Sequence, residues 1–380
     1  MIRLVFWLTV AAAAVWSGVA SAQTTRAPAP REVSRITVET AVKGLSNPWG
    51  FQFLPDGQML VTEVRGTMRI AAAGGGLSGP IAGVPPVLAA GQGGLLDVAL
   101  APDHATSRII YFTYSEPRGS GRSGTALARA RLVPEGGGAR LEGVAVIFRQ
   151  KPDFATPMHY GSRIAFAGDG SLFVTLGERA SARDEAQNPA SHFGKVVRLD
   201  GDGRAHPSTP KLPGWAPEVW SIGHRNPQSA AIHPATGKLW TVEHSARGGD
   251  EVNIPEAGKN YGWPVISYGR EYSGAKIGVG TAKAGLEQPV YYWDPSIAPS
   301  GMLFYTGDLL ADWKGNLLVG ALAGSHLSRL VLSGEKVVAE ERLLADQRER
   351  IRDVRQGPDG AVYVATDSSN GRILRIAPAK

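Results

Sequence analysis

"RIAFAGDGSLFVTLGE" (residues 163–178) has the pattern of two short β-strands joined by a tight turn. Apolar and polar residues alternate in its second half, which gives a strand two unlike faces. The Asp-Gly pair in the middle favours a hairpin turn, because such turns need positive φ. The stretch therefore predicts a β-hairpin.

The same hairpin pattern occurs six times along the chain. The other copies are "GFQFLPDGQMLVTE" (50–63), "LDVALAPDHATSRIIYFTYS" (96–115), "SAAIHPATGKLWTVEH" (229–244), "MLFYTGDLLADWKGNLLVGAL" (302–322) and "VRQGPDGAVYVATD" (354–367). Their mean spacing is about 55 residues, slightly above the roughly 40–50 of propeller blades. We therefore predict an all-β fold, a six-bladed β-propeller over residues 36–380. A pair of β-sandwiches would explain the hairpins but not six copies of one hairpin.

The first residues have the features of a secretory signal peptide. "MIRLVFWLTVAAAAVWSGVASAQ" (1–23) combines Arg3, an apolar run from Leu4 to Val15, and a small-residue cleavage site after Ala22. A membrane anchor is the alternative, but the run is short and rich in alanine. We expect residues 1–22 to be removed, residues 23–35 to form a flexible Pro/Ala-rich lead-in, and the mature protein to be periplasmic without a membrane span.

The composition narrows the class of partner. The 380 residues carry a formal net charge of +6 without any Lys/Arg run, which disfavours nucleic-acid binding. The chain has no cysteine, so the fold does not use disulfides. There is no nucleophile elbow and no HExxH motif, so the common serine-hydrolase and zinc-protease signatures are absent.

Polar residues next to the hairpins are candidates for a site, because propeller ligands bind over the central channel. His159, just before the 163–178 hairpin, titrates near neutral pH as a general base must. Gln92 lies in the glycine-rich "GQGGLLDVAL" (91–100) and offers both a donor and an acceptor. Taken alone, His159 also fits a packed or surface histidine, and Gln92 a turn residue.

Two further segments carry arginines. Arg225 and Asn226 directly follow a strand in "GHRNPQ" (223–228), and arginine suits an anionic oxygen or carboxylate. Arg350 and Arg352 alternate on one strand, so both side chains point to the same face and together suit an acidic ligand. An ion pair between blades, for Arg225, and a solvated face, for the arginine pair, remain alternatives.

An acidic region follows in "EHSARGGDEVNIPEAGKNYGWPVISYGREY" (243–272). Asp250 and Glu251 adjoin glycines, and Glu256 and Glu271 come later. Carboxylates and carbonyls in flexible loops are what Ca²⁺ requires. A solvated acidic loop is the alternative.

Taken together, these segments resemble the soluble pyrroloquinoline quinone (PQQ)-dependent sugar dehydrogenases, and most closely their periplasmic aldose sugar dehydrogenase branch. The resemblance covers about residues 40–377. It rests on "GLSNPWGFQFLPDG", "GQGGLLDVAL", "HYGSRI", "GHRNPQ", "GGDEVN", "GKNYGWP", "PSIAPSG" and "RIRDVRQGPDG", in this order. The family fold is a six-bladed propeller, in agreement with the repeat count.

The resemblance implies roles for individual residues. His159 matches the base that takes the proton of a sugar's anomeric hydroxyl while hydride moves to the quinone. Arg225 and Asn226 match residues beside the quinone oxygens and the substrate, and Gln92 matches a substrate-side glutamine. Arg350 and Arg352 match the arginines that hold the cofactor's carboxylates.

A Ca²⁺ ion is also implied, bound through backbone carbonyls at Ser245 and Ala246, with a further calcium region at Glu251, Tyr261 and Glu271. An aldose substrate and a separate electron acceptor complete the expectation.

Four residues at three places depart from the family pattern. Ser245-Ala246 replaces the usual Gly-Pro, Met158 replaces an acidic residue before the base, and Ala323 stands where a cofactor-binding lysine is usual. His326 is the nearby candidate to replace that lysine. Two alternative functions therefore stay open at this point: a Ca²⁺-dependent lactone hydrolase, and a non-catalytic propeller that binds sugars or proteins.

Overall fold

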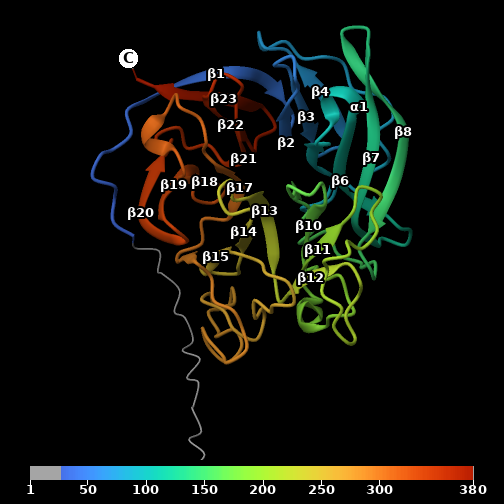
Figure 1. Ribbon diagram of the computed structural model, residues 1–380, viewed down its shortest axis with the longest axis vertical. Coiled ribbons are helices and arrows are strands. Elements are labelled where there is room, and N and C mark those ends of the chain that lie inside the picture. The colour runs from blue at the N-terminus through green and yellow to red at the C-terminus, as the bar shows by residue number, and fades with distance from the viewer. Residues whose placement is uncertain (1–26, 380) are drawn as a thin grey trace, which may run out of the picture.

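A computed structural model describes residues 27–379, and six antiparallel sheets stand around a central axis in it (Figure 1). The predicted six-bladed β-propeller is confirmed. We number the sheets as blades 1 to 6 from the first complete sheet along the chain.

The first three blades are formed by consecutive strands. Blade 1 has three strands, β2 (Pro48–Phe53), β3 (Met59–Glu63) and β4 (Thr67–Ala71). Blade 2 contains β5 (Leu95–Leu100), β6 (Ile109–Pro117), β7 (Ser123–Glu135) and β8 (Gly138–Arg149), with the short helix α1 (His104–Ser107) between its first two strands. Blade 3 contains β9 (Ile164–Phe166), β10 (Leu172–Leu176), β11 (Lys195–Leu199) and β12 (Val219–Ile222), with the 3₁₀ turn η1 (Arg183–Gln187) after β10.

The last three blades complete the ring. Blade 4 contains β13 (Asn226–Ile232), β14 (Leu239–His244), β15 (Asp250–Asn253) and β16 (Tyr291–Trp293). Blade 5 contains β17 (Pro299–Phe304), β18 (Leu317–Ala321), β19 (His326–Ser333) and β20 (Lys336–Leu343), with the 3₁₀ turn η2 (Ala311–Trp313) after β17. Blade 6 contains β21 (Ile351–Gln356), β22 (Val362–Thr366), β23 (Gly371–Pro378) and, outermost, β1 (Ile36–Leu45).

The six predicted hairpins are the two innermost strands of the six blades. In the 163–178 hairpin, for example, β9 pairs with β10 from Phe166↔Leu172 to Ile164↔Val174. The first strands of neighbouring blades contact one another around the whole ring. Residues just before and after these inner strands are therefore brought to the central axis.

The ring closes through blade 6, where the chain's first and last strands pair. β1 lies antiparallel to β23, from Ile36↔Pro378 to Leu45↔Gly371. The hydrogen bonds of this pairing join the first and last strands of the propeller and close the ring of blades.

Apolar side chains fill the space between each pair of neighbouring blades. Between blades 4 and 5, Trp240 meets Phe304 edge-on with 5.4 Å between ring centroids, and both are buried. Between blades 2 and 3, Tyr111 meets Phe166 in the same way at 5.2 Å. The hydrophobic core is thus divided into separate clusters between neighbouring blades, and polar residues lie near the central axis.

The segment before β1 runs along blade 5. Ser34 donates hydrogen bonds to the carboxylate of Glu341 from its backbone N–H (2.6 Å) and its hydroxyl (2.7 Å), and Trp313 Nε1 donates to the same hydroxyl at 2.8 Å. The predicted signal peptide (1–22) lies outside the described residues, and the flexibility of the lead-in stays a prediction. Within residues 27–379 no helix has the length and apolar character needed to cross a membrane.

Candidate active site

His159 lies in the segment between β8 and β9, just before the innermost strand of blade 3. Its φ is +51°, which is unusual for a residue other than glycine. Its N–H donates to Oε1 of Gln92 at 2.9 Å. Gly177, just after β10, packs against its carbonyl group so closely that a Cβ on Gly177 would lie 2.5 Å from the carbonyl carbon. The backbone of His159 is thus fixed by contacts with two blades.

The imidazole ring is held by a carboxylate that the sequence analysis did not single out. Nδ1 of His159 lies 2.6 Å from Oε2 of Glu178, and both side chains are buried. The same oxygen accepts the N–H of Ala180 at 2.8 Å. A carboxylate partner favours the tautomer that carries its proton on Nδ1. Nε2 makes no hydrogen bond to the part of the chain described here, so its lone pair can accept a proton.

The surroundings keep the ring neutral. Burial lowers the pKa of His159 below its ordinary value of 6.5, the carboxylate of Glu178 opposes this, and the charges of Arg225 and Arg179 lower it further. At neutral pH the ring is therefore unprotonated. A buried, neutral and oriented histidine meets the requirements for a general base.

A cavity of about 590 Å³ opens beside Gln92 at the centre of the ring. This volume lies in the range of small-molecule sites, roughly 300–1,000 Å³. The residues that line it come from blades 1, 2, 4, 5 and 6 and include Trp49, Arg65, Gln92, Gly93, Gln228, His244, Leu322, Arg350, Arg352 and Asp367. His159 is not among them and reaches the cavity wall through its hydrogen bond to Gln92.

The cavity carries an excess of positive charge. Arg350 and Arg352 share one carboxylate, that of Asp367, at 3.0 and 3.1 Å. The Nε of Arg352 is buried and has no hydrogen-bond partner among the described residues. Arg65 also lines the cavity, and no carboxylate of residues 27–379 pairs with it. Two arginines on one carboxylate leave a cation available for an acidic ligand.

Blade 5 contributes no cation at the position of Ala323. The two nitrogens of the nearby His326 are engaged within that blade, Nδ1 with the carbonyl of Gly324 (2.9 Å) and Nε2 with Oγ of Ser328 (3.0 Å). His326 is not among the residues that line the cavity. The cavity has an additional cation in Arg65, which follows β3 of blade 1 and was not predicted from the sequence.

Asn226 connects His159's loop to the arginines. Its Oδ1 accepts the N–H of Gly161 (3.0 Å) and Nε2 of Gln228 (3.3 Å), and Oε1 of Gln228 accepts from Arg352 at 3.2 Å. The Nδ2 of Asn226 is buried without a partner in the described chain. A buried donor left unpaired costs about 1–3 kcal/mol, so this one is suited to a ligand's oxygen.

Arg225 lies at a second, smaller hollow of about 10 Å³, on the scale of one water or ion. Its Nη1 donates to the carbonyls of His244 (3.2 Å) and Ser245, and its guanidinium lies 5.2 Å from the ring centre of Trp263. No carboxylate of residues 27–379 forms an ion pair with it. His244 lines both hollows, and burial, then the charge of Arg225, lowers its pKa to about 3.

The residues predicted to bind calcium fall into three places. Ser245, Glu251 and Tyr261 line the small hollow with Arg225. Burial, and next the charge of Glu243, raises the pKa of Glu251, as expected for a buried carboxylate without a cation. Two other predicted ligands lie apart from the hollow. Ala246 packs against Trp263 and Ile277, and the carboxylate of Glu271 pairs with Arg183.

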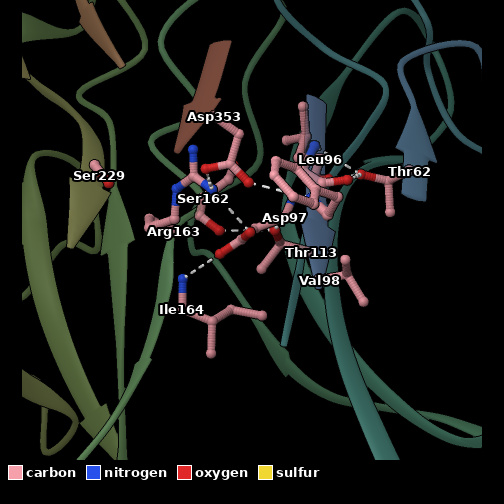
Figure 2. Close-up of polar contacts among 12 residues, drawn as sticks. Thr62, Leu96, Asp97, Val98, Thr113, Ser162, Arg163, Ile164, Ser229 and Asp353 are labelled. Atoms are coloured by element: carbon pink, nitrogen blue, oxygen red, sulfur yellow. Dashed lines mark hydrogen bonds and ion pairs between the residues drawn. The ribbon is translucent and has the colours of Figure 1, made fainter. Parts of the chain in front are cut away.

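A buried ionic network lies under the cavity floor and joins three blades (Figure 2). Nη1 of Arg163 donates to Asp97 of blade 2 and to Asp353 of blade 6, both at 3.0 Å. The same guanidinium lies 4.4 Å from the ring centre of Trp49, which lines the cavity. Arg355 pairs with both aspartates and balances the charge. The network fixes the inner strands on which the site residues stand.

The family model for Glucose / Sorbosone dehydrogenase matches residues 45–375. The chain belongs to this family. A curated family member, the aldose sugar dehydrogenase YliI of Escherichia coli (strain K12), is 46% identical over 348 residues, which cover 90% of this chain and 93% of that protein.

Solved structures of the family share the fold. The soluble aldose sugar dehydrogenase of Escherichia coli in its apo-form superposes with a TM-score of 0.87 at 45% identity and covers 90% of this chain and 100% of its own. The PQQ-bound form of aldose sugar dehydrogenase from Streptomyces coelicolor superposes at 0.75 and 28% identity, over 91% and 99% of the two chains. The predicted family is confirmed.

Proposed function

We propose that this family member is a PQQ-dependent aldose dehydrogenase that oxidises the anomeric hydroxyl of an aldose to a lactone. One observation carries the proposal: His159 is neutral and oriented, with a free Nε2, and it is bonded through Gln92 to a cavity that holds two arginines on one carboxylate.

The donors present in the site suit a tricarboxylate such as PQQ. Arg350, Arg352 and Arg65 supply cations at the large cavity, and the unpaired nitrogens of Asn226 and Arg352 supply hydrogen bonds. Arg65 supplies a positive charge to the cavity, whereas the exposed Ala323 supplies none. These groups would hold the cofactor by charge-assisted hydrogen bonds.

The small hollow suits a cation. In the proposal, the backbone carbonyls of Ser245 and Ala246 would hold Ca²⁺, and Glu251 and Tyr261 in the same hollow would form a further calcium region. Glu271 would join that region only by leaving its ion pair with Arg183. The Ser245 carbonyl accepts from Arg225. A metal at that oxygen would therefore compete with the guanidinium of Arg225.

The chain's own residues would orient the sugar and move one proton. When bound, PQQ supplies the acceptor for the anomeric hydride, and Ca²⁺ polarises the quinone oxygen as a Lewis acid. Nε2 of His159 takes the hydroxyl proton, and the carboxylate of Glu178 stabilises the imidazolium that forms. Gln92 and Asn226 would bind sugar hydroxyls, and Arg225 would bind oxygen atoms at the reacting centre.

We further infer that the protein works in the periplasm, on the basis of its predicted signal peptide. A separate electron acceptor is required, because the oxidation of each sugar releases two electrons.

The test is the variant His159→Asn, compared with the wild type after addition of PQQ and Ca²⁺ to apoprotein. Asparagine tolerates the positive φ at this position but is not a base. We expect the wild type to reduce a dye acceptor with an aldose. The variant should bind PQQ with similar affinity and lose at least about 100-fold in kcat, the usual contribution of a general base.

Retained turnover in His159→Asn would refute the assignment of the base. Hydrolysis of a lactone without PQQ would instead favour a hydrolase, and sugar binding without either activity would favour a binding propeller.

A further inference from the structure

A long loop next to the small hollow presents several exposed cations. It connects β15 to β16 (residues 254–290) and extends from blade 4 at the lower edge of Figure 1. Six exposed side chains on it and on the adjoining turn define what we call the basic face: Arg247, Arg270, Tyr272, Lys276, Val279 and Lys283.

The cations of the basic face are not neutralised by the protein itself. Within residues 27–379, no carboxylate forms an ion pair with Arg247, Arg270 or Lys283. All three acids of the loop are paired: Glu271 with Arg183, Glu287 with Lys259 at 2.9 Å, and Glu256 with Lys238 at 3.7 Å.

Two nearby acids reduce the positive charge without cancelling it. Asp184 and Asp294 are exposed close by and carry two negative charges against the four cations of the basic face. The face therefore keeps a positive excess.

Large apolar groups stand among these charges. The side chain of Tyr272 is 74% exposed and that of Val279 is 60% exposed, among the highest values for large apolar residues in the described chain. Exposed aromatic and arginine side chains together are typical of protein interfaces.

The basic face is attached rigidly to the loop of the small hollow. The backbone groups of Arg270 and Arg247 exchange two hydrogen bonds of 2.9 Å. Gly249 packs so closely on Gly269 that a Cβ would collide with its backbone. Arg270 is therefore in direct backbone contact with the turn at residues 245–249.

Under the same loop, a buried contact reaches the site itself. Ile277 is 1% exposed and packs against Ala246 and Trp263, and Trp263 lies under the guanidinium of Arg225. A partner on the basic face would thus be joined by a short chain of contacts to Arg225 and the small hollow.

We propose that the basic face is the docking site of an acidic one-electron redox protein, an inference that rests on the proposed function. Oxidation of an aldose to its lactone releases two electrons and two protons. Two molecules of the acceptor would take the electrons one at a time, and the protons would pass to water. Charge complementarity of this kind speeds encounter and weakens with salt.

The test is the double reversal Arg270→Glu/Lys283→Glu, with an acidic c-type cytochrome as the probe. Lys43→Glu/Lys336→Glu is the matched control, because it makes the same change in net charge at exposed lysines on other blades. We expect the basic-face variant to reduce the cytochrome at least about 10-fold more slowly at low salt, the lower end of electrostatic rate effects. Its activity with a small neutral dye should be unchanged.

Binding of the oxidised cytochrome is measured separately by calorimetry without sugar, so that it does not depend on catalysis. Binding that weakens in the basic-face variant alone supports the docking site. Binding that is equal in all three proteins, or that weakens equally in both variants, overturns it. A wild type that binds the cytochrome but does not oxidise any aldose overturns the proposed function and leaves the docking result standing.

Discussion

The chemistry at the residue scale depends on a pair, His159 and Glu178, of which the sequence analysis recognised one member. His159 could be singled out because histidine is rare and precedes a hairpin in a family motif. Glu178 ends the same hairpin as an ordinary polar residue, and only the closed ring shows that its carboxylate meets Nδ1 at 2.6 Å. The contact depends on the backbone of His159, whose φ is +51°. The hydrophobic pattern of the sequence does not reveal such a conformation.

The pH dependence of turnover tests this pair. A base works only when unprotonated, so activity falls as pH drops through the pKa of His159, which burial places below 6.5. Glu178 favours the protonated ring, so Glu178→Gln should lower this pKa further and move the acidic limb of kcat/KM to lower pH. The maximal kcat/KM of this variant should fall about 10–100-fold, because glutamine carries no negative charge to stabilise the imidazolium of His159. An unchanged profile, or a limb that moves to higher pH, would contradict the role of Glu178.

At the scale of elements, the inner hairpins could be predicted and their surroundings could not. Alternation and Asp-Gly turns are local signals, so the first two strands of each blade were recognised. The outer strands and the long loop at 254–290 are determined by packing against neighbouring blades. For that reason the placement of Glu271 with Arg183, and of Ala246 against Ile277, did not follow from residue types.

The end of β10 provides the element-scale prediction. A Cβ at Gly177 would meet the carbonyl group of His159, whereas a Cβ at Gly168 in the same hairpin meets nothing within 4 Å. Gly177→Ala should therefore displace His159 and lower kcat/KM about 100-fold, the cost of roughly 1 Å of misplacement. Gly168→Ala should keep wild-type kinetics, and circular dichroism should show both variants folded. Full activity in Gly177→Ala would contradict the proposed positioning of the base.

At the scale of the whole molecule, closure of the ring creates the site. Pairing of β1 with β23, and the network of Arg163, Asp97 and Asp353, bring loops from distant parts of the chain around one cavity. Removing one partner from a buried ionic network costs about 3–5 kcal/mol, so the network has little freedom to vary. The number of blades was predictable from six repeats. The sharing of Asp367 by two arginines, and the presence of Arg65, required the three-dimensional arrangement.

The most direct measurement of the central claim is an equilibrium titration of purified apoprotein with PQQ in the presence of Ca²⁺. An aldose is then added together with a dye that serves as electron acceptor. We predict saturable binding of one quinone per chain, weakened when Arg352 is replaced by glutamine, and dye reduction only when quinone and sugar are both present. Absence of quinone binding, or dye reduction that does not need it, would contradict the account.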